Sequence, residues 1–465
     1  MQKGSVTAEE KRGEACGLEG EAFLQQKKRR EEEEERGGSC SPPWGCLHSA
    51  TASLQVATDP VFFSVKTTPF QLDSVALRNA FHGKNSLKVV HRLGPCSPSG
   101  KGQLSDDEIL GQDAERVAYF QKVVKKAANL SGDPVEGSLD VTLPARSGAT
   151  VGSPSYVVTI GLGTPRVEQT VVFDSGSSLC WVQCKSCQSC YRQKEPIFDP
   201  GLSSTYRKVR CNEEACTRLE PNERGCTNNT CTYNTVYADS STTSGVLSLD
   251  KLSLPTPPNE FASFVFGCGN KNKGLFKGAA GLFGLGRGYH SLATQVSGTH
   301  GKVFSYCLPS KDTVGHLTFG RPLARSPSYT PLGNTNDPNV YLIELIGFSV
   351  GHIRMPIRPA IFQRGAIIDS GTVVTHLPQA AYAVLRNAFR VEMERHRYRL
   401  ARPVNILDTC YLINRSNFSY PPITLHFRGK DGDAVSLIGS TQQAGSEVIY
   451  DNVQHRIGFA PGTCS

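Results

Sequence analysis

The feature that most constrains this chain is a short element that occurs twice, about 195 residues apart. Residues 171–178 read VVFDSGSS and residues 366–373 read AIIDSGTV, so each copy has an apolar run, Asp-Ser-Gly and a hydroxyl residue. Each copy is followed later by an apolar-apolar-Gly element, GLFGLG at 281–286 and LIGS at 437–440. One Asp-Ser-Gly would be read as an ordinary turn. Two copies in matching contexts predict that both halves of the chain carry the same structural device.

The two aspartates of this repeat, Asp174 and Asp369, suggest a specific chemistry. Two carboxylates about 3 Å apart share one proton, because both cannot be ionised together. One can then activate a water molecule as a base while the other protonates a carbonyl, which allows peptide hydrolysis without a metal or a covalent intermediate. Such a pair titrates as a unit, so neither residue receives a fixed role. We therefore expect the two halves to fold with these side chains face to face.

The residues beside each aspartate fit that arrangement. The glycine after each Asp-Ser is expected to allow a tight backbone turn. The Ser175 and Ser370 hydroxyls are expected to bond across the two loops and fix their approach. Ser177 and Thr372 stand where a hydroxyl can donate to the outer carboxylate oxygen and hold its charged form.

The rest of the sequence predicts an all-β protein with a few short helices. From Tyr156 onward, short β-branched runs are broken by Gly and Pro, which number 45 and 28 in the chain. One helix is expected at 379–390, where apolar residues recur at helical spacing, and another after Ser291. Upstream, a short strand is expected within 86–97 and a helix over 104–126.

The sixteen cysteines indicate disulfides and an oxidising compartment. Twelve lie from Cys180 onward, and seven crowd between Cys184 and Cys231. Cys184, Cys187 and Cys190 form a CxxCxxC run, so a zinc site was weighed. A second CxxC about 15–20 residues further on would be needed and is missing. We favour disulfides and expect no metal and no cofactor.

Charge and hydropathy narrow the function classes further. The net charge of +8 is attributed to solvated surface, and without a basic stripe interleaved with aromatics we do not expect nucleic acid as a partner. No run of about 18 apolar residues occurs, so no membrane span is expected. Residues 1–60 are polar, are read as disordered and show no secretory signal, which conflicts with the cysteine argument.

On these residues the chain resembles the pepsin-like aspartic proteases, and in particular their plant nepenthesin-like branch. That branch includes apoplastic proteases and chloroplast nucleoid DNA-binding aspartic proteases. The resemblance covers about residues 86–465 and rests on long strings: LKVVHRLGPCS, SDDEILGQDAERV, YVVTIGLGTP, FDSGSSLCWVQC, FSYCLP, IIDSGTVVTHLP, LDTCY and VIYDNVQHRIGFAPGTC.

The resemblance implies a bilobal β fold with a central cleft and a particular organisation. We expect an atypical N-terminal extension at 1–85 and a pro-segment at 86–150. An N-terminal lobe with a cysteine-rich insertion follows at 151–335, and a C-terminal lobe at 336–465.

The resemblance also implies an aspartic endopeptidase made as a zymogen, with a basic pro-segment over the carboxylate cleft. Asp174 and Asp369 match the catalytic aspartates, and Tyr237 matches the tyrosine at the tip of the substrate-covering flap. Trp181 matches the indole that bonds this tyrosine, although Trp181 as plain core and Tyr237 as an ordinary strand residue stay open. Protein or peptide substrates, a monomer, and the secretory pathway and apoplast, or else the chloroplast, are expected.

The sequence departs from the family pattern in two regions of the protease part. In the flap, Ala238 and Ser240 replace glycines, at about 1–2 kcal/mol each if the backbone there has positive φ. Asp369 to Gly439 spans 70 residues, whereas Asp174 to Gly284 spans 110.

From this difference we expect a C-terminal lobe shortened by about 25–35 residues near Val435. The shortening would remove the partner of Cys410, while Cys180 is an additional cysteine. The alternative function is a binding protein on a protease scaffold, like plant glycosidase inhibitors that have lost a catalytic aspartate. The shortened lobe favours that alternative, and the presence of both aspartates opposes it.

Overall fold

The structure is a computed structural model of the whole chain. It describes residues 61–63, 86–92, 116, 156–237, 240–254, 259–274, 276, 278–309, 314–334, 339–362, 365–372, 375–403, 408–412, 421–428 and 443–461. Among these residues, no helix is long and apolar enough to cross a membrane.

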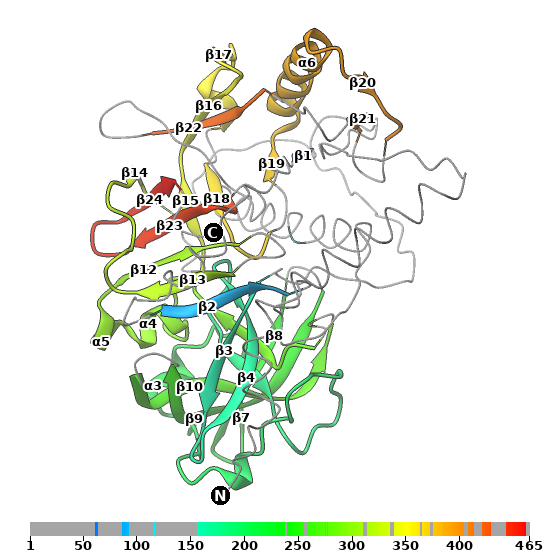
Figure 1. Cartoon of the computed structure of the whole chain (residues 1–465). Coiled ribbons are helices and arrows are strands. Elements are labelled where there is room, and N and C mark those ends of the chain that lie inside the picture. Colours follow the sequence, from blue (N-terminus) through cyan, green and yellow to red (C-terminus); the bar gives the residue numbers. More distant parts are fainter. Residues whose placement is uncertain are drawn as a thin grey trace, which may run out of the picture.

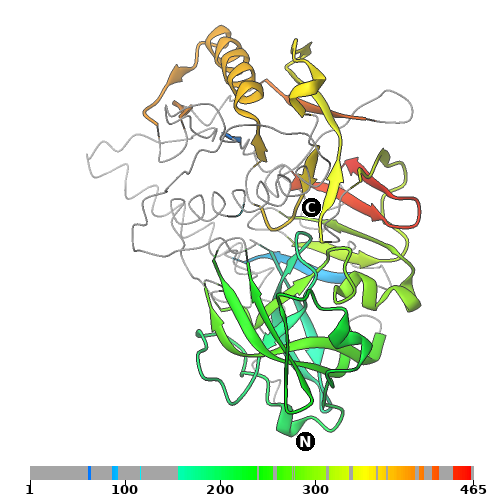
Figure 2. The ribbon, with the colours of Figure 1, turned by 180° about the vertical axis from the view of Figure 1, so that it is seen from behind.

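The fold is all-β and bilobal, with few helices (Figure 1). Strands of the first lobe lie at one end, in cyan and green, and the second lobe with its helix lies at the other, in yellow and orange (Figure 2). The first lobe holds β3 (Tyr156–Leu162), β4 (Val167–Asp174), β5 (Trp181–Gln183), β6 (Arg207–Lys208), β7 (Arg224–Thr227), β8 (Thr230–Val236), β9 (Thr242–Leu254), β10 (Asn259–Lys273) and β11 (Gly281–Gly284).

The second lobe is built from smaller sheets. Their strands are β15 (Tyr341–Ile343), β16 (Leu345–Val350), β17 (Ile353–Arg354), β18 (Ala366–Ile368), β19 (Thr375–Leu377), β20 (Arg399–Leu400), β21 (Tyr411–Leu412) and β22 (Ile423–Phe427). They pair as β15–β18, as β17–β16–β22 and as β20–β21, while β19 pairs with β1 (Val61–Phe63).

A central group of strands joins the lobes. It comprises β12 (Val303–Cys307), β13 (Val314–Phe319), β14 (Ser328–Pro331), β23 (Ser446–Asp451) and β24 (Arg456–Pro461). These strands continue into the first lobe through β2 (Ser86–His91), which pairs with β13 on one side and with β3 on the other. A strand from the N-terminal part of the chain therefore lies inside the largest sheet.

The helices follow local sequence signals. In α6 (Gln379–Arg395), Tyr382, Leu385 and Phe389 recur every three or four residues and are buried, as expected for a helix with one apolar face. This helix runs five residues beyond the expected 379–390, because Met393 continues the buried face. The helix expected after Ser291 is α4 (Leu292–Gln295), where the Ser291 hydroxyl caps the backbone NH of Thr294.

The remaining helices that are fully described are short, as the sequence predicted. They are α3 (Glu214–Thr217), α5 (Ser297–His300), η2 (Pro200–Leu202) and η3 (Pro359–Phe362). The strand expected within 86–97 is β2. Of the helix expected over 104–126, only Arg116 is described, and its backbone is helical. The LIGS element and the expected shortening near Val435 lie outside the described residues.

The cysteines form disulfides, which confirms that prediction. The pairs in which both cysteines belong to the described residues are Cys184–Cys268, Cys187–Cys190, Cys211–Cys226 and Cys216–Cys231. All three cysteines of the CxxCxxC run are therefore used in disulfides. Cys180, the additional cysteine, is buried and forms no disulfide in the described chain, and Cys410 is buried as well.

The disulfides differ in how much chain they close, and this gives a stability prediction. Cys184–Cys268 spans 84 residues and Cys187–Cys190 spans 3. A cross-link restricts the unfolded chain more when its loop is longer. We expect the Cys184→Ala/Cys268→Ala double variant to lose roughly 4–5 kcal/mol of unfolding free energy, against under about 2 kcal/mol for Cys187→Ala/Cys190→Ala. Urea unfolding at pH 7 measures both, and equal losses would contradict the expectation.

Candidate functional site

Two buried carboxylates come together from the two copies of the repeat. Asp174 is the last residue of β4, whose parallel partner β11 places Gly284 beside it. Asp369 directly follows β18 in the second lobe. Their residues are 0% and 2% exposed. Burying two acids without compensation would be costly, so their partners define the site.

Each carboxylate receives the same pair of hydrogen bonds. Ser177 Oγ donates to Asp174 Oδ2 at 2.6 Å, and Thr372 Oγ1 donates to Asp369 Oδ2 at 2.7 Å. The backbone NH groups of Gly176 and Gly371 donate to the Oδ1 atoms of their own loop's aspartate, at 3.0 and 2.9 Å. The repeated sequence thus folds into repeated local geometry, with one side-chain donor and one backbone donor per carboxylate.

Reciprocal hydrogen bonds join the two loops. The backbone NH of Ser175 donates to Ser370 Oγ at 3.0 Å, and the backbone NH of Ser370 donates to Ser175 Oγ at 2.8 Å. All of these groups are buried. The contact fixes how closely the loops that carry Asp174 and Asp369 approach each other.

The two glycines have a different purpose from the expected one. The chain turns at both glycines, as expected, but neither Gly176 nor Gly371 has a positive φ, so these turns do not depend on a backbone conformation that only glycine favours. A Cβ on Gly176 would lie 2.9 Å from Asp369 Oδ1, and a Cβ on Gly371 would collide with Asp174 Oδ1. Each glycine therefore leaves room for the carboxylate of the opposite loop. The positions select glycine for space, not for backbone freedom.

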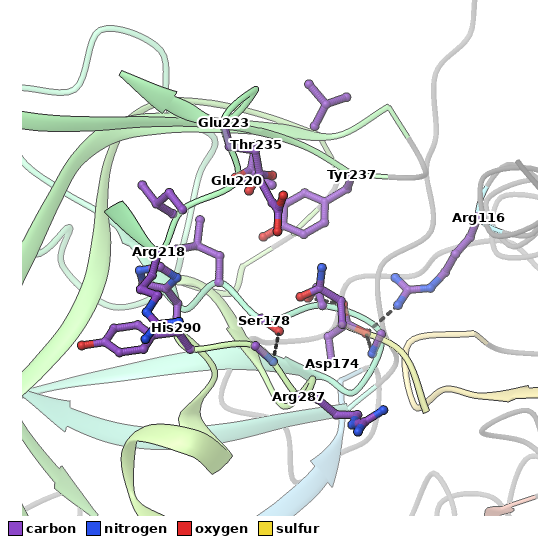
Figure 3. Close-up of a pocket in the computed structure, with 18 residues that line it drawn as sticks. Arg116, Asp174, Ser178, Arg218, Glu220, Glu223, Thr235, Tyr237, Arg287 and His290 are labelled. Atoms are coloured by element: carbon purple, nitrogen blue, oxygen red, sulfur yellow. Dashed lines mark hydrogen bonds and ion pairs between the residues drawn. The ribbon is translucent and has the colours of Figure 1, made fainter. Parts of the chain in front are cut away.

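A single arginine from the N-terminal part of the chain bridges both acids (Figure 3). Arg116 Nη2 donates to Asp174 Oδ1 at 2.5 Å, and Arg116 Nε donates to Asp369 Oδ2 at 2.8 Å. Arg116 is 5% exposed. Sequence reasoning expected a basic segment here without identifying this residue. Its signal was present, since Arg116 is the only Lys or Arg within 102–121, a stretch with five acids.

The surroundings shift the pKa values of the two acids in opposite directions. Burial raises the pKa of Asp174, and the nearby Asp369 charge adds to this, while Arg116 opposes it. Burial also acts to raise the pKa of Asp369. There, however, the Arg116 charge and hydrogen bonds from Arg116, Thr372 and Gly371 outweigh burial and lower the pKa. Without the cation, repulsion between two adjacent carboxylates favours a pair that holds one proton.

A hairpin end from the first lobe lies above the acids. Tyr237 follows β8, and Trp181 Nε1 donates to its hydroxyl at 2.8 Å. Trp181 is also fully buried and packs edge-on against Phe276, so it serves both as core and as a hydrogen-bond donor. Ser240 has φ of +61°, a strain of roughly 1–2 kcal/mol for a residue other than glycine. Ala238 lies outside the described residues.

A cavity of about 370 Å³ opens beside Asp174 (Figure 3). Arg218, Glu220 and Glu223, which follow α3 in the cysteine-rich segment, line it together with Tyr237. Residues after β11 also line it: Arg287, Gly288, Tyr289 and His290. The cysteine-rich segment thus helps to form the wall of the site. Across the described residues, no group of three or more His, Cys, Asp or Glu side chains is placed to hold a metal ion.

Two family profiles match the chain. The xylanase inhibitor N-terminal family matches residues 156–321, and the xylanase inhibitor C-terminal family matches residues 340–435. Together they span more than half of the sequence, and the second match ends where the shortening was expected.

The curated proteins described next are plant aspartic proteases that resemble this chain in sequence. Aspartyl protease AED1 of Arabidopsis thaliana is 40% identical over 429 residues, covering 85% of this chain and 90% of that protein. Aspartic proteinase nepenthesin-1 of Nepenthes gracilis is 31% identical, covering 67% of this chain and 79% of that protein. The alignment with AED1 has 429 positions, which is more than the number of residues in 85% of this 465-residue chain. Some residues of AED1 are therefore aligned with gaps in this chain.

Solved structures show the same fold at lower sequence identity. The crystal structure of soybean basic 7S globulin matches with a TM-score of 0.53 and 19% identity, covering 66% of this chain and 93% of that one. The crystal structure of the protein edgp matches with a TM-score of 0.52 and 20% identity, covering 66% of this chain and 91% of that one. With the repeat, the bilobal β fold, the two family profiles and a relative 40% identical in agreement, the chain belongs to the plant pepsin-like aspartic protease family.

Proposed function

We propose that the protein is an aspartic endopeptidase whose catalytic pair is Asp174 and Asp369. One observation carries the proposal: two buried carboxylates, from matching loops with matching donors, converge on one guanidinium. An arrangement that serves only stability would not need two adjacent buried acids, because their repulsion is costly without a cation. The cation comes from a segment proposed to be the removable pro-segment, 86–150.

In the proposed mechanism, departure of Arg116 leaves the two acids to share one proton. The ionised carboxylate takes a proton from a water molecule held between the acids, and the water oxygen bonds to the peptide carbonyl carbon. The protonated carboxyl gives its proton to the carbonyl oxygen. Collapse of the resulting diol breaks the C–N bond. One diol hydroxyl returns its proton to the carboxylate that is now ionised, and the amine leaves with the proton that the other carboxyl took from water, so the pair again holds one proton. Ser177 and Thr372 hold each ionised form, and Tyr237 covers the substrate.

We also propose that the chain is a zymogen in which Arg116 blocks the catalytic pair. The guanidinium occupies the space between the carboxylates where the water would be held. A second buried arginine, Arg92, directly follows β2, the strand of the same segment that lies within the largest sheet. A blocking residue and an anchoring strand from one stretch of sequence support an inhibitory role.

We expect acid to release this block, because the contact between Arg116 and the two acids weakens as the carboxylates gain protons. The lowered pKa of Asp369 means that the contact stabilises its ionised form. That stabilisation is complete above the ordinary carboxyl pKa of about 3.9 and is lost as the pH falls through the lowered value. The raised pKa of Asp174 means that, as the pH falls, this residue gains its proton at a higher pH than Asp369 does. The contact therefore weakens first at Asp174 and last at Asp369.

The alternative is a glycosidase-binding protein on this scaffold, which the names of the two matching family profiles favour. The intact pair and its arginine favour the protease. Protein or peptide substrates, a monomeric state and the secretory pathway complete the proposal, the last supported by the disulfides. Capture of a xylanase or glucanase by the processed protein, without casein cleavage, would favour the alternative.

Replacing one acid tests the catalytic proposal. In Asp174→Asn the pair can no longer act as acid and base together, so casein cleavage at about pH 3–5 should fall at least about 1000-fold. Asp199→Asn, at a partly exposed aspartate paired with Lys185, is the matched control and should retain activity. Casein cleavage by Asp174→Asn at the rate of the unaltered protein would refute the assignment.

Replacing the arginine tests the zymogen proposal. Arg116→Gln removes the charge that opposes substrate, so the unprocessed chain at pH 6 should bind a statine-type transition-state mimic at least about 10-fold more tightly. In the unaltered chain, binding of the mimic is expected to rise steeply as the pH falls, and this rise should be flatter in Arg116→Gln. Lys122→Gln removes one charge from the same stretch of sequence and serves as the control. Identical pH dependence in Arg116→Gln and the unaltered chain, both confirmed uncleaved by mass, would contradict the role of Arg116.

A further inference from the structure

A cluster of buried polar side chains lies behind the two acids, outside the cavity. It consists of Tyr306 on β12, Tyr450 on β23 and Gln443 just before β23, each 0% exposed. The Tyr306 hydroxyl donates to Gln443 Oε1 at 2.5 Å and lies 2.7 Å from the Tyr450 hydroxyl. None of the three lines the cavity. Their polar groups are therefore in a position to act on the site through other residues rather than on substrate.

Both ends of this cluster reach the loops that carry the acids. Gln443 Nε2 donates to the backbone carbonyl of Asp369 at 3.4 Å. The Tyr450 hydroxyl is hydrogen bonded to Ser175 Oγ at 3.4 Å, and that oxygen accepts the backbone NH of Ser370. Since Ser370 follows Asp369 in sequence, the contacts close a ring that runs through Ser175, Tyr450, Tyr306, Gln443, Asp369 and Ser370.

The chemistry of the ring points to positioning rather than proton exchange. Burial raises the pKa of both phenols well above the ordinary value near 10, so they stay protonated wherever an acid protease works. Buried polar groups are costly unless they are hydrogen bonded, and a satisfied network favours one arrangement. An apolar core would have been the simpler way to fill this space, because the rings already pack well. Phe304 stacks on Tyr450 with ring centroids 4.4 Å apart.

We propose that Tyr306, Tyr450 and Gln443 are positioning residues that set the separation of the two catalytic carboxylates. The ring holds the Asp369 backbone against the Ser175 hydroxyl, and Ser175 in turn fixes the opposite loop. The separation of two acids determines how strongly they share a proton, so the ring also sets the pH range of activity. This inference rests on the proposed protease function.

The test removes the hydroxyls while keeping the rings. We expect Tyr306→Phe and Tyr450→Phe to lower kcat about 10- to 100-fold with KM changed less than about 2-fold, because substrate contacts are untouched. The limbs of the kcat/KM pH profile should shift by about half a pH unit or more. Kinetics use the acid-processed enzyme, a fluorogenic peptide and active-site titration with the statine-type mimic, so that misfolded protein does not enter the rate.

Two further variants separate positioning from simple loss of stability. Gln443→Leu should resemble the Phe variants. Gln443→Glu, protonated at about pH 4 when buried, can still accept from Tyr306 and donate to the Asp369 carbonyl, so it should recover most of kcat there. Tyr156→Phe is the control, because it loses another buried phenol, bonded to the Pro309 carbonyl 3.2 Å away, outside the ring.

The outcomes distinguish this inference from the proposed function. If Asp174→Asn abolishes cleavage while the ring variants keep the kcat and pH profile of Tyr156→Phe, the ring is only structural and the inference fails alone. If Asp174→Asn remains active, the protease function itself fails. Loss of kcat with a shifted pH profile, recovered in Gln443→Glu, supports the ring.

Discussion

The hydrogen bonds between Ser175 and Ser370 are the constraint on which the site depends. Two lobes of one chain must bring two acids close together, and acids repel each other when ionised. The reciprocal bonds, at 2.8 and 3.0 Å, join the loops through their backbones, so the side chains follow. Gly176 and Gly371 then leave the space in which the carboxylates meet. The Arg116 charge, the hydrogen-bond donors to the carboxylates and the cavity all lie around the two loops that these bonds hold together.

Sequence predicted the parts of the site that are local and repeated. Ser177 and Thr372 could be placed because their spacing from Asp174 and Asp369 is short and occurs twice. The contact of Ser175 with Ser370 followed from the same repeat. The turns at the two glycines were predicted, but the need for space was not, since the collision that excludes a side chain involves the aspartate of the other copy of the repeat. A backbone explanation was the only one visible from neighbouring residues.

Long-range partners without a repeat were not predictable. Arg116 could be noted as an isolated cation, but its reach to both acids depends on how a separate segment lies across the fold. Tyr306, Tyr450 and Gln443 come from three stretches with no shared pattern. The all-β fold class and the presence of disulfides could be predicted, because both follow from which residue types the chain contains and how densely they occur. The insertion of β2 between β13 and β3 depends on pairing that sequence alone does not reveal.

The place of β2 has a consequence for the proposed removal of the pro-segment. This strand pairs with β13 over five positions and with β3 over two, so it closes the edges of both at once. A processed enzyme without residues 86–92 would leave two rows of backbone NH and C=O groups facing a slot one strand wide. Unpaired edges of this kind bind whatever extended chain is nearest. In the proposed conversion, cutting the chain would therefore be only half of the process, and another strand would have to take the vacated slot before the lobes are held as they were.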